Sequence, residues 1–346
     1  MTEINVAILG ASGYTGAELV RLLAGHPVFR IRALTADRKA GLPMADVFPQ
    51  FTGEDLPVLS TIADVAWDDV GAVFCALPHG TTQEVIAALP GHVKVVDLSA
   101  DFRLKDPAEY AKWYGHEHRA PALQKTAVYG VTELAREQIR AARLVANPGC
   151  YPTCAQLPLV PLLAAGLIEA DDIVIDAKSG VSGAGRAAKE ANLYTEVTEG
   201  MHAYGVASHR HGPEIDQELS LAAGKPVVVS FTPHLIPMSR GMEETLYVRL
   251  APGVSAADLR AELVRVYAGE AFVRILAEGQ VPQTRFVRAS NLCHISVHAD
   301  RRPGRAILCS VIDNVVKGAS GQALQNMNLM FGLDETTNLR LRPLFP

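Results

Sequence analysis

Cys150 has the sequence surroundings that most favour covalent chemistry. It follows the Pro-Gly turn of Val145-Ala-Asn-Pro-Gly-Cys-Tyr-Pro-Thr153, and Pro152 is suited to the first position of a helix that would begin here. A helix N-terminus carries partial positive charge, which stabilises thiolate over thiol and makes the sulfur nucleophilic near neutral pH. Asn147 and the turn could orient a carbonyl group for attack. We therefore predict that Cys150 is a nucleophile that forms a thioester.

An acid or base for this sulfur is expected in the segment Ser208-His-Arg-His-Gly-Pro-Glu214. On an extended segment His209 and His211 would face the same side, while Glu214, at the start of the following helix, could orient an imidazole. The spacing leaves open which histidine serves Cys150, and a structural histidine pair on a surface loop is the alternative. No third ligand has a recognisable spacing, so we predict no metal site.

A dinucleotide cofactor is expected at the glycine-rich turn between the first strand and the first helix. Glycines allow a tight turn there and let backbone N–H groups reach a pyrophosphate at the positive helix end. The spacing is GxxGxxG rather than the standard GxGxxG, and a plain strand-to-helix turn is the alternative. The predicted contacts in this turn are Gly10, Ser12, Gly13, Tyr14, Thr15 and Gly16.

The end of the second predicted strand favours NADP. Thr35-Ala-Asp-Arg38 follows Gly16 by about 20 residues, where an acidic residue would bind a ribose 2′-hydroxyl and an arginine would accept a 2′-phosphate. Both Asp37 and Arg38 are present. Because Thr35 and Arg38 can supply a hydroxyl and a fixed cationic fork, we predict NADP, with NADPH as the reductant. A solvated loop is the alternative.

Two further segments are candidates for binding an anionic substrate. Gly180-Val-Ser-Gly-Ala-Gly-Arg186 holds Ser182 and Arg186 among glycines that allow close backbone approach to a ligand. Ser99-Ala-Asp-Phe-Arg103 follows a predicted parallel strand, where open α/β sheets bind ligands, so Arg103 could clamp a phosphate or carboxylate. A flexible loop without function is the alternative for the glycine-rich segment.

The elements that must position these residues fall into two halves. Strands expected at 5–9, 29–36, 72–77 and 94–98, with a helix at 17–24, predict βαβ units and a doubly wound parallel sheet. Strands expected at 172–178, 226–233, 245–250, 294–299 and 306–312 predict a mixed or antiparallel sheet in an α+β fold. Helices are expected after Cys150, at 212–222, and at 256–267 with Ser255 as N-cap.

The 346 residues are enough for two domains. We expect residues 1–149 to form a Rossmann-type NADP-binding domain, completed by 318–346, in which a helix at 321–330 packs back onto the first half. Residues 150–317 are expected to form the catalytic and oligomerisation domain. Sequence patterns fix such boundaries only to within a few residues.

Composition narrows the partners and the compartment. The net charge of −5 offers no basic excess for a nucleic-acid backbone, and the longest apolar run is too short to span a bilayer, so we expect neither nucleic acid nor membrane as a partner. The N-terminal residues enter a strand pattern without a charged leader, which predicts a cytoplasmic protein. The five cysteines form no CxxC pair, so free thiols are expected.

Six motifs together resemble those of the N-acetyl-γ-glutamyl-phosphate reductases, whose fold is shared with aspartate-semialdehyde dehydrogenase. They occur in order along the chain, and the Cys150 and His209 segments are the most specific. They are Gly10-Ala-Ser-Gly-Tyr-Thr-Gly16, Ala76-Leu-Pro-His-Gly80, Ser99-Ala-Asp-Phe-Arg103, Asn147-Pro-Gly-Cys-Tyr-Pro-Thr153, Lys178-Ser-Gly-Val-Ser-Gly-Ala-Gly-Arg186 and His209-Arg-His-Gly-Pro-Glu214.

The resemblance implies NADPH-dependent reductive dephosphorylation of N-acetyl-L-glutamyl 5-phosphate to the 5-semialdehyde, in arginine biosynthesis, by a homodimer or homotetramer that releases inorganic phosphate. It implies that Cys150 is the nucleophile and that His209 or His211 is the acid or base. Substrate or phosphate contacts would come from Arg103, Asn147 and Arg186. Cofactor contacts would include Leu77, Pro78, Ser182, Gly183 and Asn314, the last at the nicotinamide carboxamide.

Two other functions would fit the same residues. A relative that reduces a carrier-linked aminoadipyl or glutamyl phosphate in lysine biosynthesis would keep each predicted catalytic residue and differ only in the pocket for the acyl amine. A nucleotide-binding regulator would have the cofactor fold without catalysis, although Cys150 and the histidine pair argue against it.

Overall fold

The computed structural model describes residues 3–345, which divide into two compact units. The first combines the chain up to Pro148 with Ala319–Arg340, and the second combines Gly149–Gly318 with the residues from Leu341 onward. In the described residues, no helix is both long and apolar enough to cross a membrane. The predicted fold class, a Rossmann-type parallel sheet followed by a second α+β part, is confirmed.

The first unit is built on a seven-stranded sheet whose paired strands all run parallel. The strand order β3-β2-β1-β4-β5-β7-β6 reverses direction between β1 and β4, the position at which open α/β sheets bind ligands. The strands are β1 (Ile4–Leu9), β2 (Phe29–Thr35), β3 (Leu59–Ser60), β4 (Ala72–Cys75), β5 (Lys94–Asp97), β6 (Val128–Tyr129) and β7 (Leu144–Ala146).

Helices connect and cover these strands. They are α1 (Tyr14–Leu23), α2 (Met44–Val47), α3 (Thr82–Ala88), α4 (Pro107–Tyr114), α5 (Pro121–Gln124), α6 (Thr132–Ala141) and α11 (Gly321–Met330). Helix α11 has the predicted bounds, is buried along its whole length and contacts α1, α6 and β5. Helix α11 therefore belongs to the first unit, as do the other residues of Ala319–Arg340.

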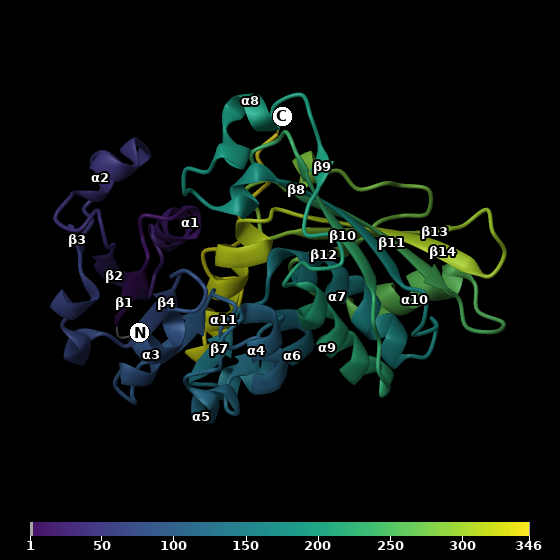
Figure 1. Cartoon of the computed structure of the whole chain (residues 1–346), viewed down its shortest axis with the longest axis horizontal. Helices are drawn as coiled ribbons and strands as arrows, with labels where there is room; N and C mark the ends of the chain where they lie inside the picture. Colours follow the sequence, from purple (N-terminus) through teal and green to yellow (C-terminus); the bar gives the residue numbers. More distant parts are fainter. Residues whose placement is uncertain (1–2, 346) are drawn as a thin grey trace. The chain divides into compact units, whose positions relative to one another are not determined.

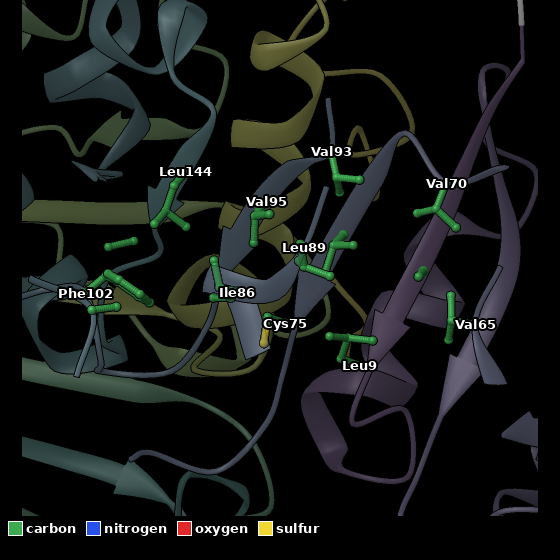
Figure 2. Packing of buried hydrophobic residues seen from close by; sticks show 14 residues of the cluster. Leu9, Val65, Val70, Cys75, Ile86, Leu89, Val93, Val95, Phe102 and Leu144 are labelled. Atoms are coloured by element: carbon green, nitrogen blue, oxygen red, sulfur yellow. The ribbon is translucent and has the colours of Figure 1, made fainter. Parts of the chain in front are cut away.

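Apolar side chains from the central strands form the core of the first unit. Leu9, Cys75 and Val95 come from β1, β4 and β5, and Ile86 of α3 packs against them (Figure 2). Strands buried on both faces in this way read as continuous apolar runs, and this is why the sequence pattern identified them. The core fixes the strand ends from which the candidate cofactor-binding loops emerge.

The second unit contains a seven-stranded mixed sheet of order β12-β13-β14-β11-β8-β10-β9. Antiparallel pairing joins β13, β14, β11 and β8, as predicted, whereas β10 runs parallel to β8. The strands are β8 (Val174–Gly180), β9 (His202–Ala203), β10 (Ser230–Ile236), β11 (Met242–Arg249), β12 (Val273–Ile275), β13 (Cys293–Ala299) and β14 (Arg305–Ile312).

The long helices of the second unit are α7 (Cys150–Ala164), α9 (Gly212–Ala223) and α10 (Ala256–Val266), with a short α8 (Tyr194–Val197) in between. Helix α7 contacts β11, β14, α9 and α10, so it is the central helix of this layer (Figure 1). The predicted N-cap of α10 is confirmed, because the hydroxyl of Ser255 accepts a hydrogen bond from the Asp258 amide. The contacts of α7 with β11 and β14 thus hold this helix, and with it Cys150, on the sheet.

Several predicted bounds were wrong by a few residues. Helix α1 begins at Tyr14 rather than at residue 17, and β10 begins at Ser230 rather than at residue 226. Strands β3, β6, β7, β9 and β12 were not predicted, because two or three residues are too few to show a hydrophobic period.

Candidate active site

Cys150 is the first residue of α7, as predicted, and is partly exposed. Gly149 is the N-cap and offers no side chain, and the first turn carries no acidic residue. Cys150 therefore lies at the positive end of the helix, and the first turn of α7 has no carboxylate of its own to oppose a thiolate. Pro152 is the third residue of the helix rather than the first, a position whose N–H would also lack an intrahelical partner.

Glu214 supports the turn before the sulfur. Its side chain lies in the first turn of α9 with 1% exposure, and one carboxylate oxygen accepts a hydrogen bond of 2.8 Å from the Gly149 amide. Gln156 of α7 donates to the Glu214 carbonyl oxygen at 3.3 Å. The sequence suggested an imidazole as the partner of Glu214, and the described contacts add the backbone of the nucleophile turn, a role that spacing along the chain did not indicate.

Gly318 closes the space behind Cys150. A Cβ atom at this position would lie 2.7 Å from Cys150 Cβ and 3.1 Å from Cys150 Cα. Contacts under 3.0 Å between such atoms require the backbone or the cysteine to move. Spacing along the sequence does not point to Gly318, because only the fold brings this residue against α7.

The two histidines lie in an aromatic cluster next to Cys150. The ring centroid of Tyr151, the following residue, is 5.6 Å from that of His209 and 5.8 Å from that of His211, and all these contacts are edge-on. His209 also packs against Tyr204 and Phe231. The predicted catalytic residues are thus brought together around the first turn of α7.

His209 and His211 occupy different environments. His209 Nδ1 accepts a hydrogen bond of 3.1 Å from the His211 amide, so in the neutral ring the proton is on Nε2. Burial, and to a lesser degree the charge of Arg210, lowers the pKa of His209 to about 4. His209 is therefore neutral near pH 7, packed on several sides and tied to the backbone of His211.

The glycine-rich loop after β8 is tied to Asn314. The Asn314 amide nitrogen donates to the hydroxyl of Ser182 at 2.9 Å, and its amide oxygen accepts from the Gly241 amide at 2.8 Å. Gly183 and Arg186, in the same loop, are exposed. Asn314 therefore orders the loop in which the predicted contacts Ser182, Gly183 and Arg186 lie.

In the first unit, the glycine turn has no room for side chains. A Cβ on Gly10, where φ is +83°, would lie 2.5 Å from the Ala76 carbonyl oxygen, and one on Gly16 would lie 2.5 Å from the Gly10 carbonyl oxygen. Gly13 is the N-cap of α1, whose first turn has no acidic residue. An uncapped helix start reached by backbone alone suits a pyrophosphate, so the turn fits the predicted dinucleotide. Ser12, Tyr14 and Thr15 lie partly or fully exposed on it.

Thr35 and Arg38, the two residues predicted to favour NADP, have different environments at the end of β2. Thr35 is 1% exposed, and its hydroxyl oxygen accepts from the Gly10 amide at 3.4 Å, so it supports the glycine turn. Asp37 and Arg38 are exposed. Among the described residues no ion pair involves Arg38, which leaves its guanidinium available to an anion.

Arg103 and Asn147 are buried near the end of β5. Arg103, 5% exposed, donates from Nε to the Asn147 carbonyl oxygen at 2.8 Å and from Nη2 to the Leu98 carbonyl oxygen at 2.9 Å. The Asn147 amide nitrogen donates to the Ala319 carbonyl oxygen at 3.1 Å. Both side chains thus hold the backbone that leads from β7 toward Cys150. Leu77 and Pro78 lie on the loop after β4 and are partly or fully exposed.

Comparison with known families assigns each half of the chain. Residues 5–142 match the family described as semialdehyde dehydrogenase, NAD binding domain, and residues 150–314 match semialdehyde dehydrogenase, dimerisation domain. Aspartate semialdehyde dehydrogenase II from Vibrio cholerae has a similar structure, with a TM-score of 0.72 and 20% sequence identity, over 95% of this chain and 99% of that one. At that identity the likeness shows the fold.

Relatives of much higher identity extend over nearly the whole chain. N-acetyl-gamma-glutamyl-phosphate reductase of Rhodospirillum rubrum is 63% identical over 349 residues, covering 99% of both chains. The probable chloroplastic N-acetyl-gamma-glutamyl-phosphate reductase of Oryza sativa subsp. japonica is 63% identical over 344 residues, covering 99% of this chain and 83% of the plant protein.

Proposed function

This chain belongs to the N-acetyl-γ-glutamyl-phosphate reductase family of oxidoreductases, and on that premise we propose that it converts N-acetyl-L-glutamyl 5-phosphate to N-acetyl-L-glutamate 5-semialdehyde in arginine biosynthesis. The observation that carries the proposal is the position of Cys150 at the start of α7, with Glu214 on the Gly149 amide and the histidine pair against Tyr151. The proposed assembly is a homo-oligomer, which the family description of residues 150–314 supports. The proposed compartment is the cytoplasm.

In the proposed reaction the Cys150 thiolate attacks the acyl carbonyl carbon. A carbon–sulfur bond forms, the bond between that carbon and the phosphate oxygen breaks, and inorganic phosphate leaves. The positive end of α7 stabilises the thiolate before the attack and again when the sulfur is expelled from the thioester. A nicotinamide cofactor, when bound, supplies the hydride that takes the acyl group to the aldehyde.

We assign the proton transfers to His211 and a positioning role to His209. His209 is neutral, and its Nδ1 is committed to the His211 amide, so its ring fixes the backbone from which His211 extends. His211 takes the thiol proton of Cys150 before attack and returns a proton when the sulfur is released. Neutral His209 can donate a hydrogen bond from Nε2 without changing its charge.

The cofactor is proposed to be NADP. The glycine turn and the uncapped start of α1 would hold the pyrophosphate, and the exposed Arg38 would hold the 2′-phosphate. Arg186 and the loop that Asn314 orders would contact the substrate and the cofactor, while Arg103 and Asn147 would keep the backbone before Cys150 in place.

The decisive experiment is the reverse reaction of the purified protein with N-acetylglutamate semialdehyde, phosphate and NADP. Turnover that requires phosphate supports the proposal, while turnover only with a carrier-linked aminoadipate semialdehyde would assign the protein to lysine biosynthesis. Cys150→Ser should remove turnover and keep cofactor binding. Should this variant retain wild-type turnover, the thioester is excluded.

A second pair of variants separates the histidines. His211→Asn is expected to lower kcat by roughly 10²–10⁴-fold, the usual contribution of a general acid or base, and to remove the corresponding limb of the pH profile. His209→Asn keeps an acceptor for the His211 amide, and we expect a smaller loss with the pH profile retained. The reverse pattern would give the proton transfers to His209.

A further inference from the structure

A network of two carboxylates and two hydroxyls is buried beside the loop that follows β4. Asp97 ends β5, Ser99 and Asp101 follow it, and Thr82 begins α3. Each of the four side chains is at most 1% exposed. They lie next to the apolar core, because Cys75 of that core pairs with Asp97 across β4 and β5. The proposed catalytic steps make no use of this network.

The four side chains form a continuous chain of short oxygen contacts. The Ser99 hydroxyl lies 2.7 Å from Asp97 Oδ2 and 2.8 Å from the Thr82 hydroxyl. The Thr82 hydroxyl lies 2.9 Å from Asp101 Oδ2 and, at a longer 3.2 Å, from Asp97 Oδ2. The Ser99 amide donates to Asp97 Oδ1 at 3.0 Å.

The two hydroxyl hydrogens of Ser99 and Thr82 are too few for the three shortest oxygen–oxygen contacts of this network. With both carboxylates ionised, Ser99 and Thr82 supply one hydrogen each, so one of the three contacts of 2.9 Å or less would place lone pair against lone pair. A proton on Asp97 fills all three, because Asp97 then donates to Ser99, Ser99 to Thr82, and Thr82 to Asp101. Burial raises the pKa of Asp97 to about 7, against the opposing hydrogen bonds from Ser99, which agrees with this count.

Asp101 connects the network to the backbone of the loop. Its Oδ1 accepts from the Gly80 amide at 2.7 Å and from the Tyr110 hydroxyl at 3.0 Å, and its Oδ2 accepts from the Thr82 amide at 3.0 Å. One carboxylate thus fixes the last residue of Ala76–Gly80 and the start of α3. Gly80 has a φ of +81°, a conformation that glycine adopts without strain. The hydrogen bond from its amide to Asp101 fixes the position of the turn.

We propose that Asp97 and Asp101 share one proton through Ser99 and Thr82, and that this proton-sharing relay positions the loop Ala76–Gly80 for binding of the nicotinamide cofactor. Asp97 and Asp101 are positioning residues, since they act through the loop. The inference rests on the proposed function in one respect, namely that this loop contacts the cofactor.

The relay gives cofactor binding a defined pH dependence. Above about pH 7 Asp97 loses its proton, the Thr82 hydroxyl is drawn toward a second anion, and Asp101 loses a donor, so the loop is held less firmly. The charged or titratable groups that face Asp97 are Asp101 and Arg103 on the following segment and Cys75 on β4. Strand β7 and helix α11 bring no ionisable side chain, and Glu84 of α3 is exposed and faces Arg119.

Infrared spectroscopy tests the shared proton directly. The wild-type protein should show the C=O band of a protonated carboxylic acid that disappears as pH rises through about 7. Asp97→Asn should remove that band, and Glu244→Gln, which changes another buried carboxyl group, should leave it. If no band titrating in this range is lost in Asp97→Asn, the relay as proposed is overturned.

Cofactor titration tests the link to function. The affinity of the wild-type protein for NADPH should be about tenfold weaker at pH 8.5 than at pH 6.5, the scale of one lost hydrogen bond. In Asp97→Asn the side-chain amide donates to Ser99 at any pH. After correction for the titration of NADPH itself, the affinity of this variant should therefore not change between the two pH values. Thr82→Val should bind weakly at both pH values, while the exposed control Asp106→Asn should follow the wild type. Equal pH dependence in wild type and Asp97→Asn would contradict the proposal.

Amide hydrogen exchange of the cofactor-free protein separates this inference from the proposed function. After correction for intrinsic rates, the Gly80 and Thr82 amides should lose protection at pH 8.5 in the wild type and keep it in Asp97→Asn. Identical protection in both proteins overturns the relay. If the Gly80 and Thr82 amides respond to pH as described but the protein binds no nicotinamide nucleotide, the relay is supported and the proposed cofactor is refuted.

Discussion

The carboxylate of Glu214 accepts a hydrogen bond of 2.8 Å from the backbone amide of Gly149, the N-cap of the helix that begins with Cys150. The two residues are 65 positions apart, and Glu214 is almost completely buried. The bond joins the first turn of α9 to the first turn of α7. The position of the candidate nucleophile therefore depends on a side chain of a different helix.

Two substitutions of Glu214 should distinguish its role as a hydrogen-bond acceptor from the role of its negative charge. Glu214→Gln keeps an oxygen that can accept from the Gly149 amide, so it should reduce kcat only a few-fold relative to the wild type. Glu214→Leu leaves that buried amide without its acceptor. For the leucine variant we expect kcat to fall by about 10–100-fold and the free energy of unfolding to fall by about 1–3 kcal/mol. Steady-state kinetics and urea unfolding measure both. Equal kinetics for the two variants would show that the Gly149 contact does not matter for turnover.

Gly318 provides a test of how tightly Cys150 is placed. In Gly318→Ala the new methyl group would lie 2.7 Å from Cys150 Cβ, so either α7 or the residue must shift. We expect kcat to fall by about 10–100-fold with NADPH affinity unchanged, because a displacement of about 1 Å is enough to misalign a nucleophile. The control is Gly91→Ala, since a Cβ there meets open space. Wild-type turnover in Gly318→Ala would mean that the site tolerates the displacement.

Candidate site residues could be recognised from the sequence where they lie close together along the chain. The Pro-Gly turn before Cys150, the glycines at 10–16 and the paired histidines are such local patterns, and the fold class followed from buried apolar strands. The contacts of Glu214 with Gly149 and of Gly318 with Cys150 were not predictable, because they join segments that only the packing of α7, α9 and β14 brings together.

Two buried polar residues have structural contacts that the sequence did not indicate. The resemblance implied a cofactor contact for Asn314, and its position suggested one for Thr35; in the structure their polar atoms also bond to Gly241, Ser182 and Gly10. A side chain next to a ligand loop and a side chain that builds the loop have the same spacing in the sequence. Only their exposure, 1% for Thr35 and 4% for Asn314, separates the two cases.

Arg38 tests the coenzyme preference. Its exposed guanidinium is proposed to hold the 2′-phosphate, so Arg38→Ala should weaken NADPH binding by about 10–100-fold and leave NADH binding nearly unchanged. Fluorescence titration with both coenzymes measures the ratio. Lys39→Ala removes a neighbouring exposed cation and serves as the control. An equal loss for NADPH in both variants would point to general electrostatic attraction rather than to a specific contact.

Glu244 should make the protein less stable as pH rises. It lies on β11 opposite Ala177 and Ser310, is 0% exposed, and neither of its carboxyl oxygens has a hydrogen-bond partner within the described part of the chain. Burial raises its pKa well above the ordinary value, and the charge of Lys178 opposes this only in part. The native state therefore keeps a proton that the unfolded chain releases above about pH 4.5, the ordinary value for glutamate.

The sign of this effect follows from the proton count. Below the unfolded pKa both states hold the proton, and Glu244 contributes no pH dependence. Above it the native state binds one proton more, so the free energy of unfolding falls by about 1.4 kcal/mol per pH unit until the native group also ionises. Urea unfolding at pH 5, 6, 7 and 8 measures the slope. Glu244→Gln should flatten it, whereas Asp97→Asn should change it only up to about pH 7, where the native carboxyl of Asp97 titrates. A slope that Glu244→Gln leaves unaltered would mean that Glu244 is ionised in the native protein, and a cation or water molecule would then have to reach it inside the sheet.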